Sequence, residues 1–169
     1  MNCHQSKPRF NLKFAIDGNI AAGKSTLIEA IARVRPDWTV VPEPVSKWTS
    51  VKKKGLQIGS DLTVEQQNGG NLLKMFYADQ KRWAYTFQSY ALFSKLRLHS
   101  RPVGDAGEVA PVQIFERSYY SDRYIFAENC FEQGSMLETE WNIYKEWCDY
   151  LVESMGEWNC FDHLVFYYF

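Results

Sequence analysis

Short apolar runs alternate with longer amphipathic stretches along the chain. Residues 10–17 (FNLKFAID) alternate in polarity and predict a strand, whereas residues 25–34 (STLIEAIARV) repeat apolar positions at helical spacing. Two further runs, WTVVPE at 38–43 and VQIFE at 112–116, predict strands, and DHLVFYYF at 162–169 predicts a fourth. The pattern indicates strands separated by helices.

The stretches between these runs predict helices and loops. Residues 71–99 contain neither Pro nor Gly, so we expect the longest helix there, and residues 119–155 carry further helical patterns. Residues 49–63 and 101–111 are interrupted by Gly or Pro and predict loops. Because strands that alternate with helices form parallel sheets, we expect an α/β fold with helices on both faces of the sheet, in a single domain over residues 1–169.

Composition limits the classes of partner. The net charge of -1 gives no electrostatic reason to expect nucleic acid or an anionic membrane, and no apolar run approaches the ~20 residues of a membrane helix. The four cysteines lack a C-x-x-C spacing, which predicts free thiols in a reducing compartment. We expect a cytoplasmic protein; a mitochondrial location is the alternative if a transit segment is missing.

One motif indicates a phosphate site. GNIAAGKS at 18–25 fits G-x-x-x-x-G-K-[ST], in which two glycines let backbone N–H groups point inward and the next helix adds its positive end. Lys24 is then placed to reach the β- and γ-phosphates, and Ser25 to offer its hydroxyl to Mg²⁺. The predicted ATP-phosphate residues are Gly18, Asn19, Ile20, Ala21, Ala22, Gly23, Lys24, Ser25 and Thr26. The motif predicts a P-loop NTPase fold, and the lack of N-K-x-D and D-x-x-G signatures counts against a GTPase.

Charged residues follow the other predicted strands. Glu116 ends VQIFE and is a candidate for helping to hold Mg²⁺, and Arg117 beside it suits a transferring phosphoryl group. Glu43 follows the second strand, where a carboxylate can take a proton from an attacking hydroxyl. The plain alternatives are a surface Glu-Arg pair and a solvated loop residue.

The predicted long helix carries two stripes. One is polar with small residues and the other is mainly aromatic; they consist of Tyr77, Lys81, Ala84, Gln88, Ala91 and Lys95, and of Trp83, Phe87, Tyr90 and Ser94. Two alanines around Gln88 leave room for a flat group, and an amide that donates and accepts suits a nucleobase edge. From spacing alone we favour the alternative, in which the aromatic stripe is core and the polar stripe faces water.

Four segments together resemble a known family. They are IDGNIAAGKST, VVPEPVSKW, NGGNLLKMFYADQKRWAYTFQSYALFSKLRL and FERSYYSDRYIFAENCF, and they are similar to the deoxynucleoside kinases, in particular the deoxycytidine and deoxyguanosine kinase branch. The resemblance runs from about residue 12 to the last residue. It implies ATP-dependent phosphorylation of a deoxyribonucleoside at its 5′-hydroxyl for nucleotide salvage, with Mg²⁺, in a homodimer.

The resemblance also implies roles for individual residues. Glu43 would be the base for the 5′-hydroxyl, Arg117 would stabilise the phosphoryl group, and Glu116 would assist Mg²⁺ together with Ser25. The deoxynucleoside would contact Ile20, Glu43, Val45, Trp48, Phe76, Tyr77, Phe87, Gln88, Ala91, Lys95, Arg117, Asp122 and Phe126. Within that set, Tyr77 would hold the sugar 3′-hydroxyl, and Gln88 would pair with the base.

Two features depart from that family. Lys95 stands where the branch usually carries an arginine partnered with the aspartate at 122; lysine keeps the charge without the planar fork, and the polar pair favours deoxycytidine or a purine over thymidine. Family members also continue past residues 162–169, through an arginine-rich lid and an adenine loop. We therefore expect this chain to be an N-terminal part of such a kinase. The alternatives are a nucleoside-binding fragment with little turnover, and a nucleoside monophosphate kinase, which would need basic residues in the acceptor pocket.

Overall fold

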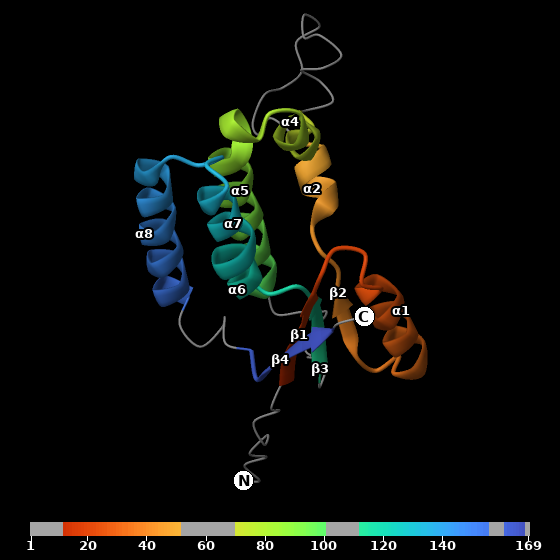
Figure 1. Ribbon diagram of the computed structural model, residues 1–169. Helices are drawn as coiled ribbons and strands as arrows, with labels where there is room; N and C mark the ends of the chain where they lie inside the picture. Colours follow the sequence, from red (N-terminus) through yellow and green to blue (C-terminus); the bar gives the residue numbers. More distant parts are fainter. Residues whose placement is uncertain (1–11, 52–69, 101–111, 156–160, 168–169) are drawn as a thin grey trace, which may run out of the picture. The chain divides into compact units, whose positions relative to one another are not determined.

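The computed structural model describes residues 12–51, 70–100, 112–155 and 161–167 (Figure 1). The chain divides into two compact units that alternate along the sequence. The first, here called the sheet unit, comprises Met1–Glu43, His99–Ser118 and Glu157–Phe169; the second, the helical unit, comprises Pro44–Leu98 and Tyr119–Gly156. A single domain over residues 1–169 stays a prediction.

The sheet unit contains four parallel strands. They are β1 (Leu12–Gly18), β2 (Thr39–Val41), β3 (Val112–Glu116) and β4 (His163–Tyr167), arranged in the order β2-β3-β1-β4 (Figure 1). Ile16 of β1 lies opposite Glu116 of β3, and Gly18 lies opposite Tyr167 of β4. The predicted parallel sheet of an α/β fold is confirmed, and the ends of β1 and β3 lie side by side.

Helix α1 (Lys24–Val34) packs against this sheet through the apolar positions that predicted it. Ile28 joins Ile16, Val112 and Ile114 in a buried cluster, and Leu27 and Ile31 pack around it. Strand β2 is shorter than the expected span 38–43, because Pro42 has no N–H with which to continue the ladder.

The helical unit contains the remaining helices. They are α2 (Val45–Thr49), α4 (Leu72–Ala78), α5 (Gln80–His99), α6 (Tyr119–Ser121), the π-helical turn η1 (Asp122–Ala127), α7 (Glu128–Glu132) and α8 (Glu138–Met155). In Figure 1, α5, α7 and α8 lie side by side, and α8 contacts both α7 and η1.

The prediction of one helix over residues 71–99 is wrong. Asp79 leaves the helical conformation, with φ -151° and ψ 87°, and separates α4 from α5. Its carboxylate accepts a hydrogen bond of 3.1 Å from the backbone N–H of Arg82, and Asn71 accepts one of 2.8 Å from Lys74 in the same way. Each helix therefore begins at its own side-chain cap.

The helical stretch predicted over residues 119–155 is also interrupted. Gly134 has φ 70°, a left-handed conformation that favours glycine, and it follows α7 directly after Gln133. Glu140 then accepts a 2.9 Å hydrogen bond from the backbone N–H of Leu137 where α8 begins. The interruption between α7 and α8 is therefore a turn at Gly134, followed by a side-chain cap from Glu140 at the start of α8.

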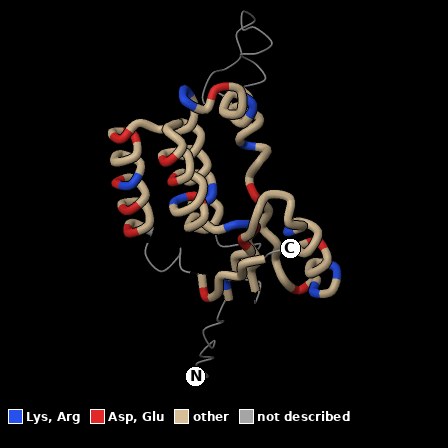
Figure 2. The backbone as a smooth tube through the Cα atoms, viewed as in Figure 1, with Lys and Arg blue, Asp and Glu red and all other residues tan. Residues whose placement is uncertain are grey.

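None of the helices in the described residues is long and apolar enough to cross a membrane. Basic and acidic residues, coloured along the backbone in Figure 2, occur in both units.

Candidate active site

The predicted phosphate-binding residues form the turn between β1 and α1. The turn leaves β1 at Gly18 and enters α1 through Gly23, which has φ 85°, and Ala21 has φ 63°. Side chains are strained in such left-handed conformations, which explains the glycine at 23. The first turn of α1 carries no acidic residue, so its N–H groups present an uncompensated positive end.

Lys24 is folded into this turn. Its ammonium donates a 2.5 Å hydrogen bond to the carbonyl oxygen of Asn19, and its side chain is buried. Burial lowers the pKa of Lys24 below its ordinary value, and the positive charge of Arg117 lowers it further, while the carboxylates of Glu116 and Glu43 oppose the shift. The cation is thus held inside the loop that would surround a phosphate.

The two predicted magnesium residues lie in contact. The Ser25 hydroxyl donates a 2.7 Å hydrogen bond to Oε1 of Glu116 at the end of β3. A hydroxyl and a carboxylate oxygen are the ligand types that Mg²⁺ accepts, and Mg²⁺ keeps other positions for water and phosphate. Among the described residues there is no group of three or more His, Cys, Asp or Glu that could hold a metal. The pair therefore fits an ion that arrives with a nucleotide.

Arg117 contacts both Glu43 and the predicted phosphate loop, the glycine-rich motif at residues 18–25. Its Nη1 donates a 3.0 Å hydrogen bond to the carbonyl oxygen of Gly18, and its Nε lies 3.6 Å from Oε2 of Glu43. Arg117 also has φ 64°, a left-handed conformation that costs a residue with a side chain roughly 1–2 kcal/mol. The base candidate and the phosphoryl-binding candidate are thus neighbours in one unit.

Two residues near Arg117 were missed by sequence reasoning. Asp17 is buried at the end of β1, and its carboxylate accepts hydrogen bonds from Ser118: 3.2 and 3.3 Å from the backbone N–H and 2.6 Å from the hydroxyl. The signal available was an acid at the end of a predicted strand, after the apolar run of residues 14–16 and immediately before the glycine-rich motif.

Gln88 and Lys95 are buried in the helical unit. The side-chain amide of Gln88 donates a 3.4 Å hydrogen bond to the sulfur of Cys130, and the Lys95 ammonium lies 2.6 Å from Oδ1 of Asp122. Gln88 is 3% exposed and Lys95 is 1% exposed, so the interpretation that this stripe faces water is wrong for both. Sequence reasoning did not identify Cys130 as the hydrogen-bond partner of Gln88. Burial raises the pKa of the Cys130 thiol, so the sulfur stays protonated near neutrality.

Three aromatic residues among the predicted nucleoside contacts, Trp48, Phe76 and Phe87, pack together. Phe87 stacks on Phe76 with ring centroids 4.7 Å apart and meets Trp48 edge to face at 5.5 Å. The Trp48 indole N–H donates a 2.9 Å hydrogen bond to Ser94, and the Lys95 ammonium lies 5.6 Å from its ring centroid. Of the predicted aromatic stripe, Phe87 and Ser94 are buried, whereas Trp83 and Tyr90 are half-buried, so the expectation that the stripe is core holds for two of its four members.

The remaining predicted nucleoside contacts differ in exposure. Ala91 is buried on α5 and Phe126 is half-buried in η1, whereas Val45 and Tyr77 are exposed on α2 and α4. Ile20 belongs to the sheet unit and is also exposed.

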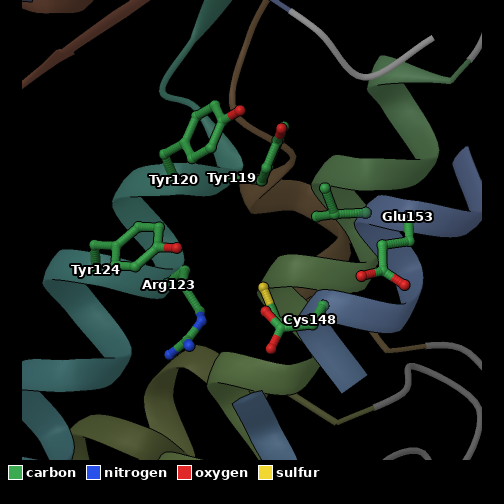
Figure 3. A pocket seen from close by; sticks show the side chains of 8 residues that line it. Tyr119, Tyr120, Arg123, Tyr124, Cys148 and Glu153 are labelled. Atoms are coloured by element: carbon green, nitrogen blue, oxygen red, sulfur yellow. The ribbon is translucent and has the colours of Figure 1, made fainter. Parts of the chain in front are cut away.

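A separate pocket of about 170 Å³ lies between η1 and α8 (Figure 3). It is lined by Tyr119, Tyr120, Arg123, Tyr124, Cys148, Asp149, Val152 and Glu153, none of which was a predicted site residue. Burial raises the pKa of Cys148 to about 11, so the thiol in this pocket is protonated and a poor nucleophile at neutral pH.

Comparison with known proteins gives a consistent match. The family model described as deoxynucleoside kinase matches residues 14–168. Deoxycytidine kinase 2 of Gallus gallus is 47% identical over 142 residues, covering 83% of this chain and 53% of the relative. Human deoxycytidine kinase is 46% identical over 147 residues, covering 86% and 56%. The mitochondrial deoxyguanosine kinase of Xenopus laevis is 34% identical over 156 residues, covering 91% and 58%. The chain thus spans about half the length of the curated relatives it matches.

Proposed function

The chain belongs to the deoxynucleoside kinase family, and from that premise we propose that it transfers the γ-phosphoryl group of ATP to the 5′-hydroxyl of a deoxyribonucleoside, a step of nucleotide salvage. The observation that carries the proposal is the placement of Arg117, which contacts both Gly18 of the phosphate loop and Glu43. In this reaction the 5′-oxygen forms the new bond to phosphorus, the bond to the β-phosphate oxygen breaks, and ADP leaves.

The donor phosphates would occupy the turn from Gly18 to Thr26. Backbone N–H groups at the start of α1 would cradle them, and Lys24 would exchange the Asn19 carbonyl for a β- or γ-phosphate oxygen. Ser25 and Glu116 would hold Mg²⁺, which supplies neutralising charge to the phosphates when bound.

Glu43 and Arg117 would act at the transferring group. Glu43 would accept the proton of the 5′-hydroxyl as that oxygen attacks, and Arg117 would stabilise the negative charge on the phosphoryl oxygens. The Nε atom of Arg117 lies 3.6 Å from Oε2 of Glu43, so the two charged groups lie next to each other, and Arg117 also contacts Gly18 of the phosphate loop.

The deoxynucleoside base would lie against the aromatic cluster of Trp48, Phe76 and Phe87. The Gln88 amide would face the base edge, with one of its two N–H groups already directed to Cys130. The buried Lys95-Asp122 pair offers both a donor and an acceptor, which suits deoxycytidine or a purine deoxynucleoside better than thymidine. The names of the relatives from bird and human, both deoxycytidine kinases at 46–47% identity, favour deoxycytidine among these substrates.

We also propose a homodimer in the cytoplasm. Helix α8 carries exposed Ile143, Trp147 and Tyr150 at spacings of four and three, which places them in one apolar stripe. A second copy of the chain is the partner that the family premise favours for this stripe.

The decisive experiment measures transfer of labelled γ-phosphate from ATP-Mg²⁺ to deoxycytidine, deoxyadenosine, deoxyguanosine and thymidine. We expect the rate of transfer to each of the first three deoxynucleosides to exceed the rate of transfer to thymidine. Lys24→Ala is expected to abolish transfer and leave deoxynucleoside binding intact, and Glu43→Gln is expected to lower kcat far more than it raises KM. Binding without transfer by a folded chain would instead favour a nucleoside-binding role, and loss of both would contradict the proposal.

A further inference from the structure

The backbone at Arg117 is held in an unfavourable conformation. Its φ of 64° lies in the left-handed region, although the residue is an arginine. The backbone N–H of Arg117 donates a 3.1 Å hydrogen bond to the carbonyl oxygen of Ile16, so the strand pairing is continued up to this residue. Something beyond the strand register must hold the chain in the turn that follows.

Asp17 makes the contacts at that turn. Both of its carboxylate oxygens lie within 3.3 Å of the backbone N–H of Ser118, and Oδ2 accepts the Ser118 hydroxyl at 2.6 Å. Both residues are 1% exposed. Hydrogen bonds to an ionised group in such a buried setting are among the stronger ones in proteins.

The position of these bonds in the chain is informative. The paired register of β1 and β3 ends at Ile16 and Glu116, one residue before Asp17 and two before Ser118. The backbone of Arg117 is therefore held on both sides. Its own N–H is bonded to the carbonyl oxygen of Ile16, and the N–H of the next residue, Ser118, is bonded to Asp17. Its side chain then points to Gly18 and Glu43.

We propose that Asp17 is a positioning residue for Arg117: through Ser118 its carboxylate fixes the left-handed turn that aims the guanidinium at the phosphate loop. The inference rests on the proposed function, because that function gives Arg117 its role. Asp17 itself is buried and engaged by Ser118, so it acts through the backbone and not on the substrate.

A first test reads Arg117 directly and needs no turnover. The Nε–H resonance of Arg117 in a ¹⁵N-labelled full chain is identified by its loss in Arg117→Lys, and its exchange with water is measured. We expect this exchange to accelerate about tenfold or more in Asp17→Asn, because the turn that holds the guanidinium loses its charged acceptor. We expect a smaller acceleration in Ser118→Ala, which loses the 2.6 Å hydroxyl bond but keeps the backbone N–H contact with Asp17. Ser118→Ala keeps the Asp17 charge, so it separates positioning from an effect of that charge on Lys24. Ser121→Ala, at a buried serine three residues later, is the matched control and is expected to leave exchange unchanged.

A second test uses kinetics. Misplacement of a catalytic group by about 1 Å can cost about 100-fold in rate, so we expect Asp17→Asn and Ser118→Ala to lower kcat by about 10- to 100-fold with KM for the deoxynucleoside within about twofold. Combined with Arg117→Lys, either substitution is expected to cause no further loss. Unchanged Nε–H exchange in both folded variants, Asp17→Asn and Ser118→Ala, would overturn the proposal, as would a full additional loss in the Arg117→Lys background. If the unaltered chain transfers no phosphate, the proposed function fails, whereas the exchange measurement still decides the role of Asp17.

Discussion

Lys95 and Asp122 are the most deeply buried pair of opposite charges in the helical unit among the described residues. They lie 2.6 Å apart with side chains 2% and 3% exposed. Removing one partner of such a pair leaves a buried charge without compensation, which costs about 3–5 kcal/mol. Substitutions that keep the charge are therefore the ones that can report on recognition without unfolding the protein.

Lys95→Arg is such a substitution. The planar guanidinium can bind Asp122 through two parallel hydrogen bonds, which leaves fewer carboxylate lone pairs for a base and moves the positive charge. We expect the ranking of kcat/KM among deoxycytidine, deoxyadenosine and deoxyguanosine to change severalfold, with the melting temperature changed little. An unaltered ranking in the folded variant would place Lys95 outside base recognition.

Cys130 fixes the Gln88 amide by accepting one of its N–H groups at 3.4 Å. Cys130→Val removes the acceptor at similar volume, leaves that N–H buried without a partner and permits the amide to rotate. We expect deoxynucleoside affinity to fall by about three- to tenfold, measured by quenching of tryptophan fluorescence. Cys130→Ser keeps an acceptor and is the matched control; equal losses in both variants would show that the sulfur contact has no role in orienting Gln88.

At the scale of elements, local patterns predicted the glycine-rich turn between β1 and α1 and the strand and helix that flank it, because the motif needs only neighbouring residues. The helix break at Asp79 was missed although the signal was present: an aspartate three residues before Arg82 is a favourable cap, and a stretch without Pro or Gly does not rule out a cap. The burial of Lys95 could not be predicted from spacing. Lys81 occupies the same stripe and is exposed, so the difference comes from what packs against each end of α5.

A cysteine on helix α8 makes the free energy of unfolding depend on pH. Cys148 is buried there, and its pKa is raised from 9.0 to about 11. Below pH 9 the thiol is protonated in both the folded and the unfolded chain; above it the unfolded chain loses the proton first, so stability is lost as pH rises through about 11. A shift of this size corresponds to at most roughly 3 kcal/mol.

We therefore expect the free energy of unfolding to fall more steeply between pH 9 and pH 11 in the unaltered chain than in Cys148→Ser. Urea titrations at several pH values measure the difference. Parallel curves for the two proteins would show that Cys148 ionises equally in both states.

At the scale of the whole molecule, the chain passes between the two units four times, at 43–44, 98–99, 118–119 and 156–157. Glu43, the proposed base, stands at one of these crossings, and Ser118, which follows Arg117, stands at another. Sequence analysis predicted Glu43 and Arg117 as site residues but not their contact. The contact joins the ends of two strands that are more than 70 residues apart in sequence, and it follows from the pairing of β2 with β3 in the sheet.

The proposed homodimer gives a prediction at the same scale. Trp147 is 55% exposed in the middle of the apolar stripe on α8, where a charge would be buried in the dimer. We expect Trp147→Glu to sediment as a monomer with unchanged far-ultraviolet circular dichroism. Asn142→Glu adds the same charge at an exposed position off the stripe and is expected to leave the dimer intact. A dimer that persists in Trp147→Glu would place the interface elsewhere.

Gly18 belongs to two structures at once. It begins the phosphate loop, and it pairs with Tyr167 in β4 so closely that an added Cβ would lie 2.1 Å from the Tyr167 carbonyl oxygen. Its φ of 150° is also one that side chains rarely adopt. In a library of all single substitutions, this position should tolerate no replacement, and no second change confined to the loop should rescue one. Evolutionary change at this position is thus restricted by the architecture of the sheet, independently of whether the turn binds phosphate.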